Sequence, residues 1–437
     1  MAEFLSTKPY KGSRDFYPEE MRSREWMFST MSRVVESFGF ERYDAPLIEP
    51  LEIYLRKTSE EIVNQQIYSF LDRGERKVAI RPEMTPSVAR MVARRFSELV
   101  KPLRWYSIPN LWRYEQPSRG RLREHWQLNC DIFGAQDEFL ADIEILLLAI
   151  NLLKAFGANQ EHFRLKLSHR QILNQVLYEL LSLPPESWLP IGRIIDKKDK
   201  ITVAEFEDLL QKEGLDREQI KTLFSYLEEK EDFLERHAQW SSAHYLLRIL
   251  KFLEDMGVRP YIDYDPAIVR GFDYYTGIVF EVYDRHPENR RSLFGGGRYD
   301  ELTGAFSKEK VNAVGFGMGD VTLEDFLKTH GLWQTFPRKT ELFMALFGEE
   351  ELIVHSQKLA QKLRDHGFCV EMSLNSARLG RQFEEAHRKE IPLVLVIGSE
   401  EYKAGLVLVK DLNTGEQRRF SEEELLRYLK ERQKNLK

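Results

Sequence analysis

Apolar residues recur at helical spacing over 21–38, from Met27 to Phe38, and Gly39 then provides a typical helix stop. The pattern predicts an amphipathic helix followed by a strand that begins near Glu41. Short apolar runs bounded by proline and glycine come next and predict antiparallel strands, while helical spacing predicts two helices that cover them. The strands are expected within 78–86, 103–115 and 125–134, and the helices over 84–97 and 138–155.

The pattern changes in the middle of the chain. From about 170 to 257 the sequence is charged, leucine-rich and helical in its spacing, which predicts a helical insertion. Strand-like segments return at 267–284 and 313–319, and the glycine-rich stretch 293–302 is predicted to be a loop between them. Strand and helix then alternate over 341–437, as in an independent α/β domain. We therefore predict two domains, 1–330 and 341–437, with the insertion inside the first.

Composition narrows the class of protein. A chain of 437 residues with 42% apolar content is long enough for two or three packed units. Cys130 and Cys369 lack the spacing of metal ligands, so neither a disulfide framework nor a zinc site is predicted, and a cytoplasmic setting is expected. No stretch approaches the ~20 apolar residues of a membrane span. The net charge of -6 gives no general affinity for nucleic acid, so any RNA contact must come from a local patch.

The segment 113–131 carries the densest candidate chemistry. Guanidinium groups bind phosphate oxygens bidentately, so several arginines around one hairpin suit a polyanion such as a triphosphate. A solvated basic hairpin on the protein surface would have the same composition. The arginines are Arg113, Arg119, Arg121 and Arg123.

Three other segments hold weaker candidates. Arg270 precedes the paired tyrosines Tyr274 and Tyr275, which point to opposite faces of a strand, so at most one of them can face a given pocket directly. Ordinary core tyrosines would give the same pattern. The glycines at 295–297 suit a sharp turn or a close approach to a ligand. The RPEMT stretch at 81–85 contains polar residues that exposed turns also carry routinely.

Taken in order, these segments resemble the histidyl-tRNA synthetase family. KGSRDFYPEE and the helix that leads to Pro46 resemble class II motif 1, and 113–134 resembles motif 2. RGFDYYTG and GGGRYD are similar to two blocks peculiar to the histidine enzymes, and GFGMG is similar to the start of motif 3. The stretch 377–401 resembles the anticodon-binding domain of the family. These ordered matches along nearly the whole chain carry the resemblance.

The resemblance implies an α+β fold: a class II antiparallel sheet flanked by helices, with the helical insertion and a C-terminal α/β anticodon-binding domain. It also implies a homodimer that activates L-histidine with ATP, releases pyrophosphate and transfers histidine to the 3' end of tRNA(His). Mg²⁺ is expected to accompany the ATP phosphates, and no metal bound tightly by the protein is predicted. No membrane partner is expected.

The resemblance assigns roles to individual residues. Arg113 and Arg270 are expected to be catalytic, since both would contact the α-phosphate. Asp131 and Tyr275 are expected to hold the two imidazole nitrogens of histidine, and Tyr274 to complete the pocket. Acceptors are expected around the α-ammonium group. The whole predicted histidine site is Glu83, Met84, Thr85, Arg113, Gln127, Asp131, Arg270, Tyr274 and Tyr275. The ATP site is expected to contain Arg113, Glu115, Arg121, Arg123 and His125. Candidate tRNA contacts are Arg119, Arg378, Arg381, Gln382 and Arg388.

The chain departs from the family pattern in motif 3. Class II enzymes usually carry an arginine about three residues after the last glycine, stacked on adenine, and this chain has Thr322 there. His125 could provide one face of an adenine stack from the motif 2 side. The departure keeps a rival open, the catalytically inactive regulatory subunit of ATP phosphoribosyltransferase. That protein usually lacks the anticodon-binding domain and often the arginines. A synthetase-like interaction module would need additional domains.

Overall fold

The computed structural model describes residues 4–55, 66–269, 275–289, 291–300, 304, 306, 311–375 and 378–435, and every structural statement below concerns these residues. Arg270 and Tyr274 lie outside them. The chain divides into two compact units, one of Met1–Phe16 and Arg24–Gln334, the other of Tyr17–Ser23 and Thr335–Lys437. Each unit is considered by itself. Within the described segments, no helix has the length and apolar character needed to cross a membrane.

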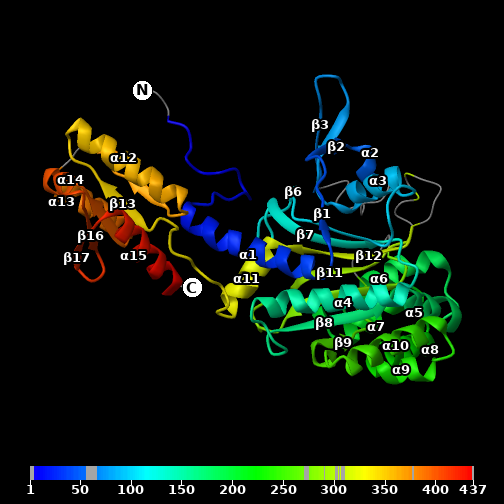
Figure 1. Cartoon of the computed structure of the whole chain (residues 1–437). Helices are drawn as coiled ribbons and strands as arrows, with labels where there is room; N and C mark the ends of the chain where they lie inside the picture. The colour runs from blue at the N-terminus through cyan, green and yellow to red at the C-terminus, as the bar shows by residue number, and fades with distance from the viewer. Residues whose placement is uncertain are drawn as a thin grey trace. The chain divides into compact units, whose positions relative to one another are not determined.

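The first unit is built on a large sheet with the strand order β1-β5-β7-β12-β11-β10-β8-β9, and β6 pairs with β7 beside this path (Figure 1). Neighbouring strands run antiparallel except at β1–β5 and β8–β9. The prediction of an antiparallel sheet flanked by helices is confirmed. The strands are β1 Glu41–Arg42, β5 Leu103–Ser107, β6 Asn110–Trp112, β7 Glu124–Phe133, β8 Phe163–His169, β9 Ile262–Tyr264, β10 Ile278–Asp284, β11 Ser292–Arg298 and β12 Ala313–Gly319.

The alternation of side chains along β7 gives the large sheet one apolar face and one polar face. Its even-numbered residues Leu128, Cys130 and Ile132 are buried in the main hydrophobic core. That core also contains residues of α1 (Pro18–Ser37) and α4 (Glu138–Ala155), which pack on this face. Because successive side chains of a strand point to opposite faces, the odd-numbered residues of β7 face away from the core. The polar side chains of this strand therefore gather on the other face.

One predicted loop is a strand. The glycine-rich stretch 293–302 was predicted to be a loop, but most of it forms β11 in the middle of the sheet. A Cβ atom at Gly296 would lie 2.1 Å from the carbonyl oxygen of Gly315, and one at Gly297 would lie 2.4 Å from that of Ile278. The glycines are therefore required because the neighbouring strands come so close, and here they do not indicate a turn.

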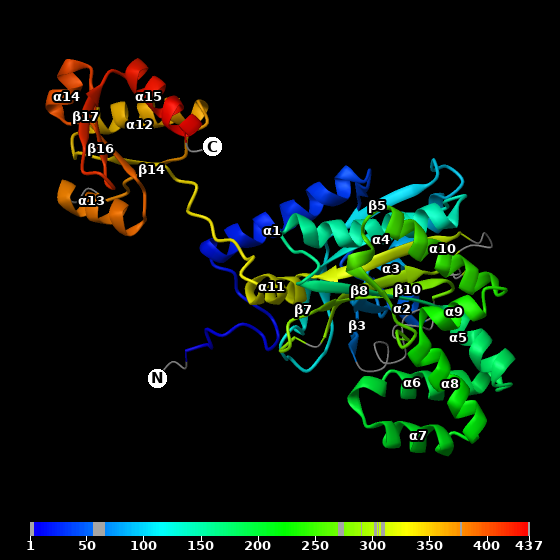
Figure 2. The same cartoon turned by 90° about the horizontal axis from the view of Figure 1, so that it is seen from below.

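Smaller elements surround this sheet. A second sheet has the order β2-β4-β3, with β2 Ile48–Pro50, β3 Tyr68–Leu71 and β4 Lys77–Ile80, beside α2 Glu52–Leu55. Helix α3 (Thr85–Arg95) follows β4, and α11 (Asp320–Thr329) follows β12. The insertion forms a helical lobe beside the large sheet (Figure 2). Its helices are α5 Arg170–Gln175, a π-helical turn Val176–Leu180, α6 Trp188–Ile195, α7 Val203–Lys212, α8 Arg217–Glu229, α9 Glu231–Arg236 and α10 Ser241–Asp255.

The second unit contains a sheet with the order β14-β13-β15-β16-β17. Strands β13 and β15 are fully buried apolar runs that pair in parallel. Strand β13 also pairs in parallel with β14, as the strand–helix–strand unit β13–α12–β14 requires. The sequence did not predict β17 or α14. The elements are β13 Leu342–Ala345, α12 Glu350–Asp365, β14 Val370–Met372, α13 Leu379–Arg388, β15 Leu393–Val396, α14 Ser399–Ala404, β16 Val407–Asp411, β17 Gln417–Phe420 and α15 Glu422–Asn435.

Candidate active site

A cavity of about 120 Å³ lies on the polar face of the large sheet. Strands β7, β11 and β12 form its floor, and the turn before α3 and the residues that follow β6 form its sides. The structure brings together there most of the residues predicted to bind histidine. The lining residues are Glu83, Thr85, Arg113, Gln127, Asn129, Asp131, Tyr275, Gly295, Tyr299, Gly315, Phe316 and Gly317.

The floor of the cavity follows from strand register. Asp131 of β7 pairs with Gly315 of β12, and Gln127 pairs with Gly319, so the polar residues of β7 lie beside a strand rich in glycine. A Cβ atom at Gly315 would lie 2.3 Å from Oδ1 of Asp131, and one at Gly317 would lie 2.5 Å from Nε2 of Gln127. Glycine in β12 therefore leaves the space into which the β7 side chains extend.

Asp131 is a strongly perturbed acid in the cavity. Its side chain is buried, and the hydroxyl of Tyr299 donates a hydrogen bond to its Oδ1. Burial raises the pKa of Asp131 to about 7, although the bond from Tyr299 opposes the rise. Sequence reasoning missed Tyr299 and Asn129. Strand alternation could have found both, because Asn129 lies midway between Gln127 and Asp131 and Tyr299 lies two residues after Gly297.

The opposite side of the cavity joins two segments that are distant in sequence. Arg113 follows β6, and its Nε donates to the carbonyl oxygen of Pro82 at 2.8 Å, next to Glu83. Met84 was predicted to bind histidine, but it is fully buried and does not line the cavity. The chain turns into α3 at Thr85, and this turn directs Met84 into the protein interior between two neighbours that reach the cavity.

The arginines of the motif 2 segment divide into different environments. Arg123 is 8% exposed; it donates to the Glu115 carbonyl oxygen at 3.1 Å, and its guanidinium lies 3.9 Å from the Tyr114 ring centroid. These contacts hold the Arg123 guanidinium against the loop. Arg123 does not line the cavity, and its ATP contact stays a prediction. Arg121 has a side chain that is 59% exposed, 3.9 Å from the Glu115 carboxylate. Arg119 pairs with Asp325 of α11 at 3.1 Å.

His125 lies in β7 opposite Leu111 of β6. Burial and then the nearby charge of Arg113 lower the pKa of His125 to about 3, so its imidazole is neutral at physiological pH. A neutral aromatic ring can stack on a purine without bringing a charge into the site.

The start of α11 shows what occupies the place of the missing motif 3 arginine. The Thr322 hydroxyl donates to the carbonyl oxygen of Leu293 at 2.8 Å, so it is directed at the sheet. Asp320 is fully buried and accepts hydrogen bonds from Arg14 and Arg24, each at 2.7 Å, and from the Trp126 backbone N–H at 2.9 Å. These bonds fix the helix start against β7.

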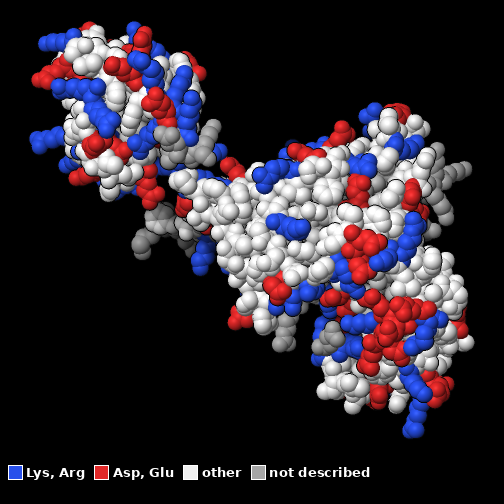
Figure 3. Space-filling model, turned by 60° about the horizontal axis from the view of Figure 1, so that its bottom comes forward, with Lys and Arg blue, Asp and Glu red and all other residues white. Residues whose placement is uncertain are grey.

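The predicted tRNA contacts in the second unit have unequal exposure. Arg378, Arg381 and Arg388 are exposed, at or within α13. Gln382 was predicted to contact tRNA, but it is 1% exposed, and its side-chain amide exchanges two 2.8 Å hydrogen bonds with the backbone of Leu346. Its amide therefore anchors α13 to the end of β13. Figure 3 shows Lys and Arg interspersed with Asp and Glu on the visible face of this unit.

Comparisons with known proteins cover both units. The family profile described as Histidyl-tRNA synthetase matches residues 12–321, and the profile described as Anticodon binding domain matches 341–432. The chain is 45% identical over 431 residues to a histidine–tRNA ligase of Leptospira biflexa, covering 98% of each chain. It is 37% identical over 416 residues to that of Haloarcula marismortui, covering 93% of this chain and 94% of that one. The crystal structure of histidyl-tRNA synthetase from Nostoc sp. PCC 7120 aligns with a TM-score of 0.78 at 26% identity, covering 97% of this chain and 100% of that chain.

Proposed function

The chain belongs to the histidyl-tRNA synthetase family, and from that membership we propose that it activates L-histidine with ATP and transfers it to the 3' end of tRNA(His). The observation that carries the proposal is the cavity that contains Asp131, Gln127 and Arg113 together. Its volume of about 120 Å³ suits one amino acid. Pockets for larger ligands span roughly 300–1,000 Å³.

Specificity for histidine would come from the imidazole. A neutral imidazole carries one donor and one acceptor, so a carboxylate and a hydroxyl on opposite sides of the ring can reject side chains that lack both. We assign these roles to Asp131 and Tyr275, both of which line the cavity. The hydroxyl of Tyr299 on Asp131 leaves the other carboxylate oxygen for the ligand. Glu83, Thr85 and Gln127 would accept hydrogen bonds from the α-ammonium group.

In the first step, a carboxylate oxygen of histidine would attack the α-phosphorus of ATP, and the bond to pyrophosphate would break in line with the new bond. Charge accumulates on phosphate oxygens and little proton transfer is needed, so positioned cations are the main catalytic device. Arg113 would bridge the histidine carboxylate and the α-phosphate. Arg270 is expected to approach from the other side, as the family resemblance implies. Arg121 is exposed enough to reach outer phosphates, and Mg²⁺ would arrive as part of the ATP substrate.

In the second step, a ribose hydroxyl of the tRNA 3' end would attack the carbonyl carbon of histidyl-adenylate, and AMP would leave. The second unit would hold the anticodon, with Arg378, Arg381 and Arg388 as exposed candidates for the RNA backbone. Arg119 would have to leave Asp325 before it could contact the acceptor end.

We also infer a homodimer. Large apolar side chains are exposed together on the small sheet and the segment before it: Leu47 at 44%, Ile48 at 48%, Phe70 at 45% and Leu71 at 62%. Ile48 and Phe70 share one face of the small sheet, because their partners Ile80 and Val78 in β4 are two residues apart. Exposed apolar side chains on that face suit the two-fold interface of a second copy.

The decisive experiment is histidine-dependent exchange of radiolabelled pyrophosphate into ATP by the purified chain, followed by charging of a tRNA(His) transcript. Exchange with histidine and none with other amino acids is expected. The rival regulatory subunit would bind histidine without exchange, so histidine binding with no ATP turnover would overturn the proposal. The match of the anticodon-binding profile to 341–432 favours the synthetase.

A further inference from the structure

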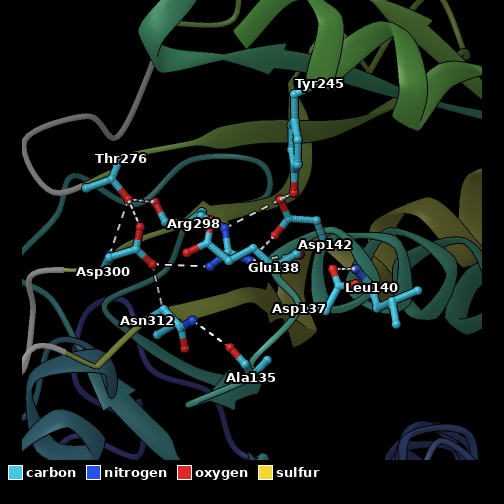
Figure 4. A network of polar contacts seen from close by, with 11 residues as sticks. Ala135, Asp137, Glu138, Leu140, Asp142, Tyr245, Thr276, Arg298, Asp300 and Asn312 are labelled. Atoms are coloured by element: carbon cyan, nitrogen blue, oxygen red, sulfur yellow. Dashed lines mark hydrogen bonds and ion pairs between the residues drawn. The ribbon is translucent and has the colours of Figure 1, made fainter. Parts of the chain in front are cut away.

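At the end of β11, successive side chains point alternately to the two faces of the sheet. Tyr299 lines the cavity, and a Cβ atom at Gly297 would lie 3.0 Å from Cδ1 of Tyr275, so these two positions belong to the cavity face. Arg298 and Asp300 alternate with them and must point to the opposite face. Their side chains meet α4 and the segment that leads into β10 (Figure 4).

Arg298 is the centre of a buried polar network. Its side chain is 5% exposed, and its Nη2 lies 2.5 Å from Oδ1 of Asp142, which is fully buried on α4. Its Nη1 lies 3.2 Å from Oδ1 of Asp300. The hydroxyl of Tyr245, on α10 of the helical insertion, donates to Asp142 at 2.8 Å. Figure 4 shows these groups converging from the sheet, α4 and the insertion.

Asp300 connects this network to the residue next to Tyr275. The Thr276 hydroxyl donates to Oδ2 of Asp300 at 2.7 Å and accepts from the Asp300 backbone N–H at 3.3 Å. The Thr276 N–H also donates to the carbonyl oxygen of Arg298 at 2.8 Å. A Cβ atom at Gly277 would lie 2.8 Å from Cδ of Arg298, so glycine there lets the arginine cross the strand closely. Thr276 is therefore held at three points.

We propose that Arg298, Asp300 and Thr276 are positioning residues for the amino-acid pocket. They fix the backbone at the entrance of β10, so that Tyr275 faces the cavity across from Asp131. The proposal rests on the proposed function, because it treats this cavity as the histidine pocket. Arg298, Asp300 and Thr276 do not line the cavity themselves, so they would act through Tyr275.

The energetics of burial support a positioning role over a purely stabilising one. Taking an arginine and a carboxylate out of water costs about as much as their attraction returns, so buried ion pairs are poor sources of net stability. They are highly directional, however, because each remaining donor and acceptor must keep its partner. A ligand-binding tyrosine must be held to within roughly 0.5 Å to be effective, and such precision comes from hydrogen bonds behind the binding residues.

The test uses Thr276→Val, which removes the hydroxyl at almost constant volume. We expect the Kd for histidine, measured by titration calorimetry, and the KM for histidine in pyrophosphate exchange to rise about tenfold, the equivalent of one lost hydrogen bond. The KM for ATP should change by less than about twofold, because Thr276 is not part of the proposed ATP site. Thr276→Ser should restore histidine affinity. Thr222→Val is the matched control, since within the described part of the chain the Thr222 hydroxyl bonds only the Glu218 carbonyl oxygen, on the insertion helix α8.

A double-mutant cycle separates positioning from general damage. If Thr276 acts through Tyr275, Thr276→Val should have little further effect on histidine affinity in a Tyr275→Phe background. Asp300→Asn provides a second variant should Thr276→Val fail to fold. Unchanged histidine affinity in the folded variants, or fully additive effects with Tyr275→Phe, would overturn the inference. A wild-type protein without exchange activity would instead defeat the proposed function, and calorimetry with histidine would still test the positioning role.

Discussion

Replacement of Asp131 by asparagine should stabilise the ligand-free protein at alkaline pH while it impairs histidine activation. The pKa of Asp131 is raised by burial from 3.8 to about 7. A folded-state pKa above the unfolded value means that the folded protein binds the proton more tightly. This group therefore favours the folded state at pH below 3.8, and its contribution is lost progressively as pH rises to about 7.

The shift from 3.8 to about 7 sets the size of the effect. At ~1.4 kcal/mol per pKa unit, the ionised carboxylate destabilises the ligand-free fold by on the order of 4 kcal/mol above pH 7. Asparagine has nearly the same shape, carries no charge and can still accept the hydrogen bond from Tyr299. The advantage of Asp131→Asn in unfolding free energy should therefore grow by ~1.4 kcal/mol per pH unit between pH 4 and 7 and then level off.

Differential scanning calorimetry without histidine, from pH 5 to 8.5, measures this difference, and pyrophosphate exchange measures the loss of function. Asp320→Asn is the matched control, because Asp320 is also buried but is paired with Arg14 and Arg24. Its loss leaves Arg24 buried without a carboxylate and should destabilise the protein by roughly 3–5 kcal/mol. If Asp131→Asn were less stable than wild type at pH 8, or equally stabilised at every pH, the assignment of a strained carboxylate would be wrong.

Three other outcomes are expected. His125→Ala should raise the KM for ATP about fivefold or more and change kcat less, as expected for lost base stacking. Because the pKa of His125 is lowered to about 3, the pH dependence of wild-type activity should show no titration of His125 between pH 5 and 8. Gln382→Ala should lower the unfolding free energy of the second unit by ~1–3 kcal/mol in calorimetry, because two backbone groups of Leu346 lose their partner, whereas Arg381→Ala should not. Phe70→Glu should shift sedimentation from dimer toward monomer, and Leu374→Glu, equally charged and on an exposed residue of the other unit, should leave it unchanged.

The spacing of apolar side chains in the sequence was sufficient to predict the helices whose inner faces are apolar. Helix α4 has the predicted limits, and α1 lies within about three residues of its predicted limits, because apolar residues mark their inner faces. The strand β11 was missed, since glycine has no side chain with which to show alternation. Its glycine content follows from contacts with Gly315 and Ile278, which only the folded chain brings near.

The candidate site shows the same division. The order of motifs located Asp131, Gln127 and Arg113 correctly within one cavity, although their roles remain predictions. Gln382 was misassigned even though the signal was available. It lies three residues after Leu379 and four before Ala386, and both belong to the apolar cluster under α13. Helical spacing thus places Gln382 on the inner face, where an amide must find backbone partners.

The absence of the motif 3 arginine bears on ATP affinity more than on the chemical step. A guanidinium stacked on adenine contributes ~0.5–2 kcal/mol, and it acts far from the bond that breaks. Thr322 is directed at the Leu293 carbonyl, and a Cβ atom at Gly120 of the motif 2 loop would lie 3.6 Å from its Cγ2, so the loop lies against this residue. On the β7 side, we propose the neutral ring of His125 for the stack with adenine. The proposed reaction requires a cation at the phosphate, and we assign that role to Arg113, which lines the cavity.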